Sequence, residues 1–442
     1  MKTTVFFISK HYENGEVLLY HTLRTSMALL QEEDFTKIFV RNDFSDRELV
    51  RKLRSLGFIT DVEDEVATIE QLRARDALKE SQVITIFSTN DCNARCPYCF
   101  EYGLPRESMS PSTADQIVAF IAGFCPGKTL QIQWFGGEPL MAMDRIRQIT
   151  VGLEAHGFAL NTRVTTNGSL LTKEDLDFFK AHYRNVAFQI TIDDIGDAYA
   201  KVKRYVDIPA EDAFQRVTDN CRLVLRSGVL LEIRINFMQE KFEAATRVFE
   251  HLENLFSNED QSKLTIYMSP ITPSEDCTDC EAFSLTPETT VTLVKFHGAH
   301  GVTAFAPVDK KHALLQTYGL KPRPSPCGQD RKHHVAITAQ GKIYKCHRLV
   351  RYAGDEYVIG NIWSGINENS LHYRDFVDSR VQDPDCRKCG MLPICQGGCF
   401  VIRKLYGKQL ACKKFKRADE LLDLYRKSLA CAAPSREETR IS

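Results

Sequence analysis

Three cysteines, Cys92, Cys96 and Cys99, stand close together in one short segment of the sequence. Three thiolates at this spacing can bind three irons of a cubane iron–sulfur cluster, whereas a full protein cage needs four cysteines. The missing ligand would leave one iron open, and the amino and carboxylate groups of an amino acid could chelate that iron. Zinc is the alternative metal, but it requires a fourth protein ligand, and none lies close in the sequence. The spacing therefore favours an iron–sulfur cluster with one open iron.

A second set of cysteines occupies the last part of the sequence, again at short and ordered spacings. Its members are Cys327, Cys346, Cys386, Cys389, Cys395, Cys399 and Cys412. The chain has 15 cysteines, and disulfides are rare in the reducing cytosol, so such a density indicates metal or redox chemistry. A pair of structural zinc ribbons, which also use a Cys-x2-Cys pair, is the alternative.

The overall composition excludes several classes of partner. With 43% apolar and 26% charged residues, the chain has the composition of a globular protein. The formal net charge is -1, which gives no global field for binding nucleic acid or membranes. No apolar run approaches the ~18 residues of a membrane span, and the N-terminal apolar run is too short for a secretory signal. We therefore expect a cytoplasmic protein that binds neither nucleic acid nor membranes.

Short β-rich runs alternate with helical patterns from residue 83 onward. Six strands are expected, at 83–88, 129–135, 161–166, 186–192, 230–237 and 264–269, with intervening helices that include 112–124, 173–182 and 210–226. Six β/α repeats imply a parallel sheet, either open and doubly wound or closed into a partial barrel. Such sheets carry their chemistry in the loops after the strands, and the first three cysteines follow the first strand.

Other strand ends carry residues that could bind a small ligand. After the second strand, Gly136 and Gly137 allow a close backbone approach, and Glu138, before Pro139, can accept from an ammonium group. Thr166, Asn167, Arg234 and Asn236 end the third and fifth strands, and Gln189, Thr191 and Asp193 share one face of the fourth as candidates for a substrate cavity. Because a charge in an apolar strand is costly unless paired, Arg234 indicates either a ligand contact or a structural ion pair.

The N-terminal segment has a pattern of its own. Residues 4–9 and 17–22 are expected to be strands, because an Asn-Gly pair between them is a strong hairpin signal. Ser45 can cap a following helix, and Gly57 can end it. A hairpin followed by helices suggests a small winged-helix-like module.

Five segments follow from these patterns. They are an N-terminal module (1–80), a β/α barrel region (81–270), a proline-rich bridging region (271–326), a cysteine-rich domain (327–415) and a final amphipathic helix with a tail (416–442).

The spacing Cys-x3-Cys-x-aromatic-Cys, with Tyr98 as the aromatic residue, resembles the signature of the radical S-adenosylmethionine (SAM) superfamily. The resemblance covers roughly residues 83–269 and implies an α/β fold with a partial (β/α)6 TIM-like barrel. In that family a [4Fe–4S] cluster cleaves SAM and releases a 5′-deoxyadenosyl radical, which abstracts hydrogen from the substrate. The resemblance implies SAM contacts from Tyr98, Gly136, Gly137, Glu138, Pro139, Thr166, Asn167, Arg234 and Asn236.

The seven-cysteine array resembles the SPASM domain of radical enzymes that modify peptides and proteins, which carries two auxiliary [4Fe–4S] clusters. The resemblance implies that the first auxiliary cluster is ligated by Cys327, Cys346 and Cys399, and the second by Cys386, Cys389, Cys395 and Cys412. The first lacks an obvious fourth ligand, so either Cys277 or Cys280 reaches back to it or one iron is open. Three [4Fe–4S] clusters are expected in all.

The N-terminal module resembles the leader-recognition modules of enzymes that modify ribosomally made peptides, and its exposed strand could bind a leader by β-augmentation. The resemblance implies a maturase that forms a thioether or carbon–carbon crosslink in a precursor peptide, served by a flavodoxin- or ferredoxin-type electron donor. One alternative is a sulfatase-maturing-type enzyme, which oxidises Cys or Ser to formylglycine. A small-molecule dehydrogenase of the same superfamily is a third hypothesis, and a non-catalytic iron–sulfur or zinc scaffold protein is a fourth.

Overall fold

The computed structural model describes residues 1–77, 81–99, 101, 104–271, 286–300, 319–325, 327–351, 355–377, 383–412, 417–432 and 438–440. It divides into two compact units. The first unit combines Met1–Leu78, Leu285–Cys327 and Ser379–Ser442, and the second combines Lys79–Ser284 and Gly328–Asp378.

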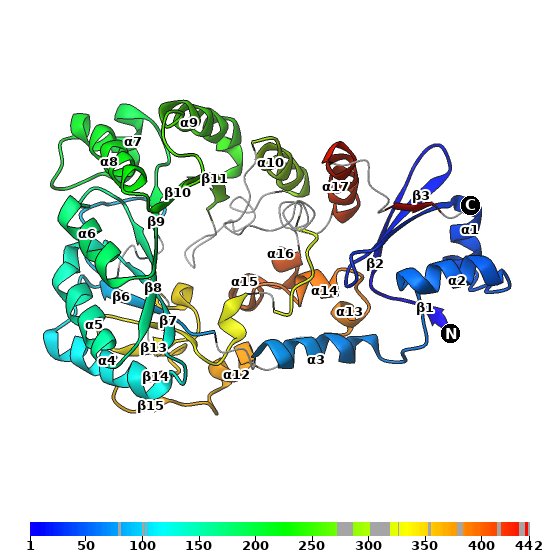
Figure 1. The fold of residues 1–442 in the computed structure, drawn as a ribbon, viewed down its shortest axis with the longest axis horizontal. Coiled ribbons are helices and arrows are strands. Elements are labelled where there is room, and N and C mark those ends of the chain that lie inside the picture. The colour runs from blue at the N-terminus through cyan, green and yellow to red at the C-terminus, as the bar shows by residue number, and fades with distance from the viewer. Residues whose placement is uncertain are drawn as a thin grey trace. The chain divides into compact units, whose positions relative to one another are not determined.

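Six parallel strands form the centre of the second unit (Figure 1). They are β6 (Val83–Thr89), β7 (Thr129–Gly136), β8 (Ala159–Thr166), β9 (Asn185–Thr191), β10 (Leu230–Phe237) and β11 (Leu264–Pro270), and they pair in chain order. The helices between them are α4 (Pro111–Phe124), α5 (Met143–Ala155), α6 (Lys173–His182), α7 (Gly196–Lys203), α8 (Ala210–Arg226) and α9 (Phe242–Leu255). The predicted α/β fold with a mainly parallel sheet is therefore confirmed, as are the three helices expected from the sequence.

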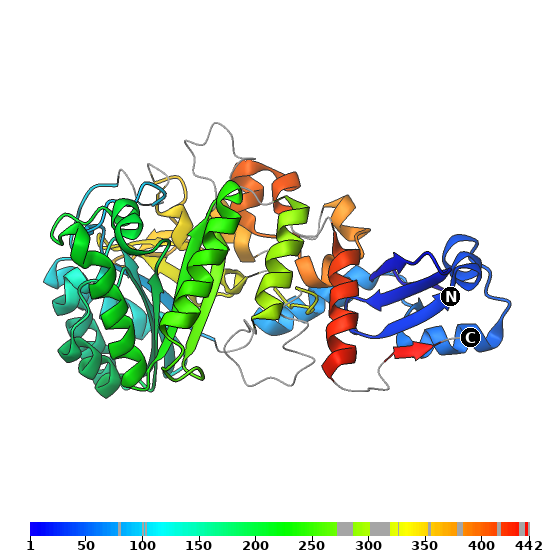
Figure 2. The ribbon, with the colours of Figure 1, turned by 90° about the horizontal axis from the view of Figure 1, so that it is seen from above.

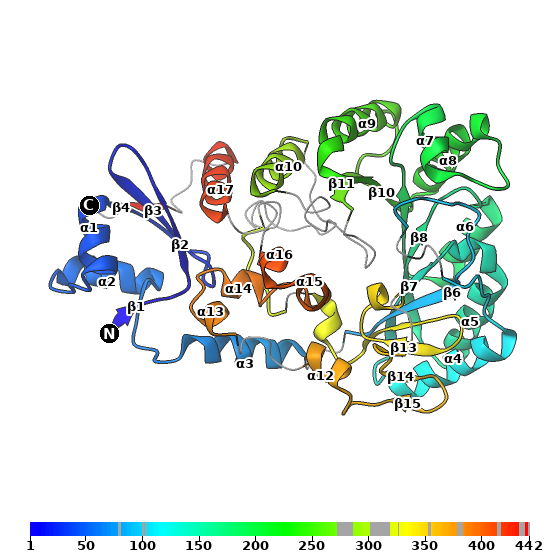
Figure 3. The same cartoon turned by 180° about the vertical axis from the view of Figure 1, so that it is seen from behind.

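Four further strands extend this sheet beyond β6 (Figure 3). β12 (His334–Ile337) runs parallel to β6, and β13 (Lys342–Tyr344), β14 (Gly360–Asn361) and β15 (Gly365–Ile366) continue the sheet in antiparallel pairs. Helix α12 (Leu371–Val377) follows them. The sequence analysis did not predict these strands, because two to four residues are too few to show an alternating pattern.

The two faces of the parallel strands differ in chemistry. One face is apolar and buried, with Trp134 on β7, Val164 on β8 and Ile233 on β10. The opposite face carries polar side chains that are buried or half-buried: Gln133, Arg163, Gln189, Glu232, Arg234 and Tyr267. Since successive side chains on a strand point to opposite faces, α4–α9 cover the apolar face and the polar face lines the inside of the curved sheet (Figure 1).

The first unit begins with an antiparallel meander of β2 (Phe7–His11), β3 (Glu16–His21) and β4 (Met27–Gln31). β1 (Lys2–Thr3) pairs with β5 (Ile59–Thr60), and the helices are α1 (Glu32–Phe35), the π-helix η1 (Thr36–Val40), α2 (Arg47–Leu56) and α3 (Glu65–Ala77). The predicted hairpin is confirmed, although its first strand begins at Phe7 and not at residue 4.

The predicted cap of the next helix was wrong by one residue. Asp46, not Ser45, caps α2: its carboxylate accepts hydrogen bonds from the backbone N–H groups of Glu48 at 3.1 Å and Leu49 at 3.0 Å. Gly57 ends the helix at φ +91, as expected for a left-handed position.

The described remainder of the first unit is built from helices, of which the four in the cysteine-rich part are short. The helices are α10 (Pro287–Ala299), α13 (Pro384–Arg387), α14 (Leu392–Cys395), α15 (Phe400–Tyr406), α16 (Lys408–Cys412) and α17 (Ala418–Ala432). α17 lies beside β2 (Figure 2), and β16 (Glu438–Arg440) pairs in parallel with β4. In the described part of the chain, no helix combines the length and apolar character needed to cross a membrane.

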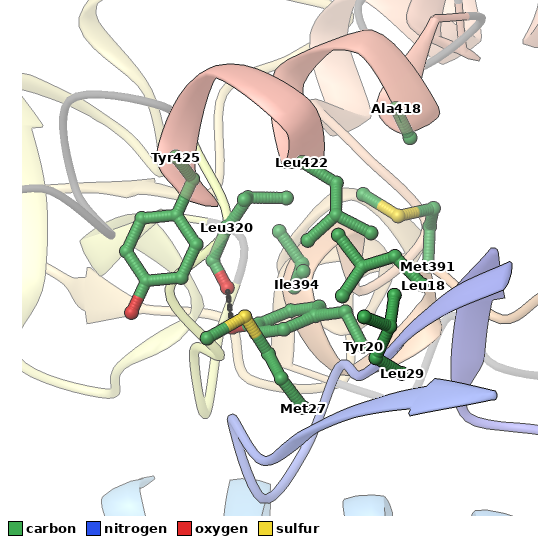
Figure 4. Packing of buried hydrophobic residues seen from close by; sticks show 10 residues of the cluster. All are labelled: Leu18, Tyr20, Met27, Leu29, Leu320, Met391, Ile394, Ala418, Leu422 and Tyr425. Carbon is green, nitrogen blue, oxygen red and sulfur yellow. Dashed lines mark hydrogen bonds between the residues drawn. The ribbon is translucent and has the colours of Figure 1, made fainter. Parts of the chain in front are cut away.

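One apolar core joins these helices to the meander (Figure 4). Its buried members are Leu18, Tyr20, Met27, Leu29, Leu320, Met391, Ile394, Ala418, Leu422 and Tyr425. The Tyr20 hydroxyl donates to the backbone oxygen of Leu320 at 2.9 Å, which satisfies the one polar atom of that side chain. The N-terminal strands and the cysteine-rich helices therefore fold as parts of one unit.

Candidate functional site

The three-cysteine loop follows β6 in the second unit, and its thiols are surrounded by donors and by each other. Cys92 Sγ lies 3.3 Å from the Ala94 N–H and 3.9 Å from Asn167 Nδ2. Burial, with the negative charge of Glu138 next, raises the pKa of the Cys92 thiol to about 12, and the other two cysteines add to this shift. Burial also raises the pKa of Cys99 to about 11. Bound iron would supply the positive charge that thiolates need here, so the donor set fits a three-cysteine cluster.

The end of α7 holds this loop through both main chain and side chain. The Lys203 backbone oxygen accepts from the Arg95 N–H at 2.8 Å. The Lys203 ammonium lies 2.9 Å from the Asp193 carboxylate and donates to the Tyr98 hydroxyl at 3.0 Å. Tyr98 in turn donates to Asp193, and the other Asp193 oxygen accepts from the Asn236 N–H at 2.8 Å. This network connects the cysteine loop to the ends of β9 and β10.

The Lys203 and Asp193 side chains are only 3% and 4% exposed, so the network is a buried ion pair. The sequence analysis missed Lys203, because nothing in the local pattern of α7 distinguishes it from the neighbouring basic residues. Asp193, predicted as a cavity residue, is engaged by Lys203, Tyr98 and the Asn236 backbone.

The glycine turn after β7 packs directly on the start of the cysteine loop. A Cβ on Gly136 would lie 2.2 Å from the Thr89 oxygen, and one on Gly137 would lie 2.2 Å from the Asp91 oxygen. The Gly137 N–H donates to Thr89 at 3.0 Å and the Glu138 N–H to Asp91 at 2.8 Å. The close approach that these glycines allow is thus to the loop backbone, whereas the sequence analysis expected it toward a ligand.

Glu138 joins two of the predicted ligand segments. Its fully buried carboxylate accepts from the Thr166 hydroxyl at 2.6 Å, the Asn167 N–H at 2.7 Å and the Leu140 N–H at 3.1 Å. Burial raises the pKa of Glu138 to about 6 despite these donors. Asn167 also donates to the Asn93 side chain at 2.8 Å. The ends of β7 and β8 therefore meet at the cysteine loop, and SAM contacts from these residues stay a prediction.

Polar residues on the inner face of the sheet form a second group. Gln189 Oε1 accepts from Arg163 at 3.1 Å and from the Tyr267 hydroxyl at 3.0 Å, and Arg163 forms an ion pair with Glu232. The Arg234 Nε donates to the Asn236 side chain at 2.8 Å, and Thr191 on β9 pairs in register with Arg234. The sequence analysis missed Arg163, Glu232 and Tyr267. The charge of Glu232 within a mostly apolar strand could have identified that residue.

Four cysteines of the C-terminal array lie together in the first unit. Cys386 is in α13, Cys395 ends α14 and Cys412 ends α16, with Cys389 between the first two. Burial raises the pKa of Cys395 to about 12, and the negative charges of Cys412, Cys386 and Cys389 add to the shift. Four adjacent thiols fit a [4Fe–4S] cluster, and they are also the donor set of a structural zinc site.

The remaining cysteine assignments stay predictions. Cys327 and Cys399 belong to the first unit and Cys346 to the second, while Cys277 and Cys280 lie outside the described residues. Within the described residues, no three Cys, His, Asp or Glu side chains are placed to hold a single metal ion.

Comparison with known proteins relates this site to one superfamily. Residues 86–246 match the model of the Radical SAM superfamily. The cysteine-type anaerobic sulfatase-maturating enzyme of Clostridium novyi is 22% identical over 340 residues, which cover 71% of this chain and 86% of that protein.

Two solved structures share the fold. Native anSMEcpe with bound AdoMet superposes with a TM-score of 0.58 at 17% identity, covering 78% of this chain and 99% of its own. Streptococcus suis SuiB bound to the precursor peptide SuiA superposes with a TM-score of 0.52 at 13% identity, covering 91% of this chain and 96% of its own.

Proposed function

Residues 86–246 of this chain form a radical SAM domain, and on that premise we propose that the protein modifies a peptide by radical chemistry. Cys92, Cys96 and Cys99 would hold a [4Fe–4S] cluster that has room for SAM as a further ligand, and the similar anSMEcpe structure carries AdoMet. The cluster and SAM supply a 5′-deoxyadenosyl radical that abstracts a hydrogen atom from the substrate.

The chain's own residues bind and orient SAM in this proposal. The turn Gly136–Pro139 and the Thr166–Asn167 segment meet beside Cys92, because Glu138 joins them. Arg234 and Asn236 lie on the inner face at the end of β10, and in this proposal they would bind the methionyl carboxylate and the ribose. Tyr98 is held by Lys203 and Asp193, so its ring is positioned before SAM binds.

A ribosomally made precursor peptide is the substrate that we propose. The carrying observation is coverage: SuiB, solved with its precursor peptide, superposes on 91% of this chain, and anSMEcpe on 78%. In the proposed reaction a thioether or carbon–carbon bond replaces two substrate hydrogens. One hydrogen atom goes to the deoxyadenosyl radical and the other leaves as a proton, and an auxiliary cluster held by the C-terminal cysteines would accept the remaining electron.

Formylglycine formation is the second candidate. The observation that favours it is the sulfatase-maturating enzyme of Clostridium novyi, which aligns with 71% of this chain at 22% identity. Both reactions remove two electrons from the substrate after the same hydrogen abstraction. A crosslink forms a bond to a second substrate atom, whereas in formylglycine formation from Cys water hydrolyses the oxidised residue and the sulfur leaves as hydrogen sulfide.

The first experiment tests the radical site itself. The anaerobically reconstituted chain is incubated with SAM and a reductant, and 5′-deoxyadenosine is quantified for the wild type and for C92A/C96A/C99A. The triple variant is expected to form no 5′-deoxyadenosine. Cys125→Ala is the control for loss of a thiol, because Cys125 is a buried cysteine at the end of α4. SAM cleavage by the triple variant would contradict the proposal.

The second experiment distinguishes the reactions and counts the clusters. A Cys-containing precursor peptide encoded beside the gene is expected to lose two hydrogens and keep its sulfur, whereas formylglycine formation from Cys removes the sulfur. Iron is expected to approach about twelve atoms per chain for three [4Fe–4S] clusters. About four atoms would reject both auxiliary clusters.

A further inference from the structure

Arg403 contacts the C-terminal cysteine array, and neither the three-cysteine motif nor the seven-cysteine array predicted this contact. Arg403 lies in α15, which begins directly after Cys399, and its backbone N–H donates to the Cys399 oxygen at 3.0 Å. Its side chain extends to another cysteine, since Nη1 lies 3.6 Å from Cys386 Sγ and 3.2 Å from the Gly397 oxygen. The same residue therefore connects a predicted ligand of the first auxiliary cluster with a ligand of the second.

The guanidinium is held in this position by Asp383. Arg403 Nη2 donates to one Asp383 oxygen. The other oxygen accepts from Lys408 at 2.7 Å and from the backbone N–H groups of Asp385 at 2.9 Å and Cys386 at 3.3 Å. Arg403 is 21% exposed and Asp383 18%. A planar fork that contacts a carboxylate and a sulfur together has little freedom to move away.

A cation against a ligand sulfur changes the redox properties of a cluster. Reduction adds one negative charge, so a positive group in contact with the sulfur stabilises the reduced form more than the oxidised form. Hydrogen bonds to the sulfurs are among the factors that set cluster potentials. Lys408 donates to the carboxylates of Asp383 and Asp385, whereas Arg403 donates to Asp383 and also lies 3.6 Å from Cys386 Sγ.

We propose that Arg403 is a positioning residue that raises the reduction potential of a [4Fe–4S] cluster held by Cys386, Cys389, Cys395 and Cys412. The proposal rests on the auxiliary-cluster part of the proposed function. A higher potential favours the step in which the oxidised cluster takes one electron from the substrate radical while the substrate releases a proton and forms its new bond. The cluster is then reduced by one electron and the substrate oxidised by one.

The test is a redox titration of the full chain that is monitored by electron paramagnetic resonance. All variants carry C92A/C96A/C99A, so that the signals come from auxiliary clusters alone. The cluster in question is identified as the one whose signal is lost in C389A/C395A. R403Q removes the charge, R403K keeps a charge but has a single donor group, and K404Q removes an exposed cation from the next position of α15.

In R403Q the midpoint potential of that cluster is expected to become more negative, with a smaller shift in R403K and none in K404Q. An unchanged potential in R403Q with unchanged iron, or an equal shift in K404Q, would overturn the proposal. If R403Q loses iron, the midpoint potential of R403K decides the question. An unchanged potential in R403K would mean that Arg403 acts in folding alone. The parent variant C92A/C96A/C99A is expected to contain about eight iron atoms. If it contained no iron and gave no signal, the cluster assignment would be rejected instead.

Discussion

At the scale of single residues, the most consequential contact of the candidate site is the buried pair of Lys203 and Asp193. The two charges lie 2.9 Å apart, and the hydroxyl of Tyr98 completes the group. A buried pair contributes little net stability, but removing one partner leaves a charge without compensation. The pair therefore fixes where the cysteine loop stands relative to β9 and β10.

Lys203→Met is expected to destabilise the second unit by about 3–5 kcal/mol, because Asp193 loses its cation in a buried site. Urea unfolding of the full chain measures this loss. Lys201→Met, at an exposed position of the same helix, is the control. Adding Asp193→Asn to Lys203→Met should recover part of the stability. Equal midpoints for the Lys203 and Lys201 variants would show that the pair has no such role.

Gly137→Ala is expected to displace the cysteine loop or the turn, because the added Cβ would stand 2.2 Å from the Asp91 oxygen. Overpacking of this kind costs about 1–3 kcal/mol. The iron content and the rate of 5′-deoxyadenosine formation should both fall. Gly123→Ala is the matched control, because its Cβ meets no described atom within 4 Å. If the Gly137 variant retained full iron and rate, the packing role of this turn would be wrong.

At the scale of elements, the β2–β4 meander contains a histidine whose protonation opposes folding. His21 on β3 is 3% exposed, and its Nδ1 accepts from the backbone N–H groups of Leu23 at 3.2 Å and Arg24 at 3.3 Å. Burial, followed by the charge of Arg24, lowers the pKa of His21 to about 4. The folded meander therefore keeps this imidazole neutral at pH values where the unfolded chain protonates it.

The stability of the meander is expected to fall as the pH falls from about 6.5 toward about 4, because the unfolded state then binds a proton that the folded state does not. The full loss is about 3 kcal/mol, from 1.36 kcal/mol per pKa unit. Hydrogen exchange of the β3 amides at about pH 7.5 and about pH 5 measures the part of this loss that occurs above pH 5, about 2 kcal/mol. His21→Asn, which keeps an acceptor, should show a smaller loss, and the exposed His156→Asn should match the wild type. Equal losses in all three proteins would contradict this assignment.

At the scale of the whole molecule, the first unit is assembled from three separate stretches of the chain. Its core places Leu18 and Tyr20 of β3 against Leu422 and Tyr425 of α17 (Figure 4). Deleting residues 1–80 would therefore remove four of the ten buried residues of this core as well as a proposed leader-binding module. Point substitutions are the sharper test of each role.

Leu422→Ala is expected to destabilise the first unit by about 2–5 kcal/mol, because this fully buried side chain leaves a cavity. Auxiliary iron should decrease, while 5′-deoxyadenosine formation by the second unit should persist. Iron analysis and limited proteolysis measure the two effects. Val40→Ala, at a 63% exposed position of the same unit, is the control. If auxiliary iron and 5′-deoxyadenosine formation were lost together, the two units would not respond separately to the substitution.

Much of the second unit was readable from local sequence. The six parallel strands were predicted within a few residues, since each has five or more residues of apolar or alternating character between turn signals. The position of the cysteine motif after β6 followed from the same pattern. Helix starts were less certain: Ser45 and Asp46 are both good caps, and the backbone geometry at Asp46 decides between them.

The sequence by itself determined the superfamily signature, the cysteine arrays and the mixed α/β fold, because these depend on residue types at short spacings. The tertiary structure alone decided that Lys203 pairs with Asp193, that Glu138 joins Thr166 and Asn167, and that Arg403 contacts Cys386. It also placed β12 beside β6. Each of these contacts joins separate elements of the chain, and such pairings depend on how whole elements pack, which no local periodicity records.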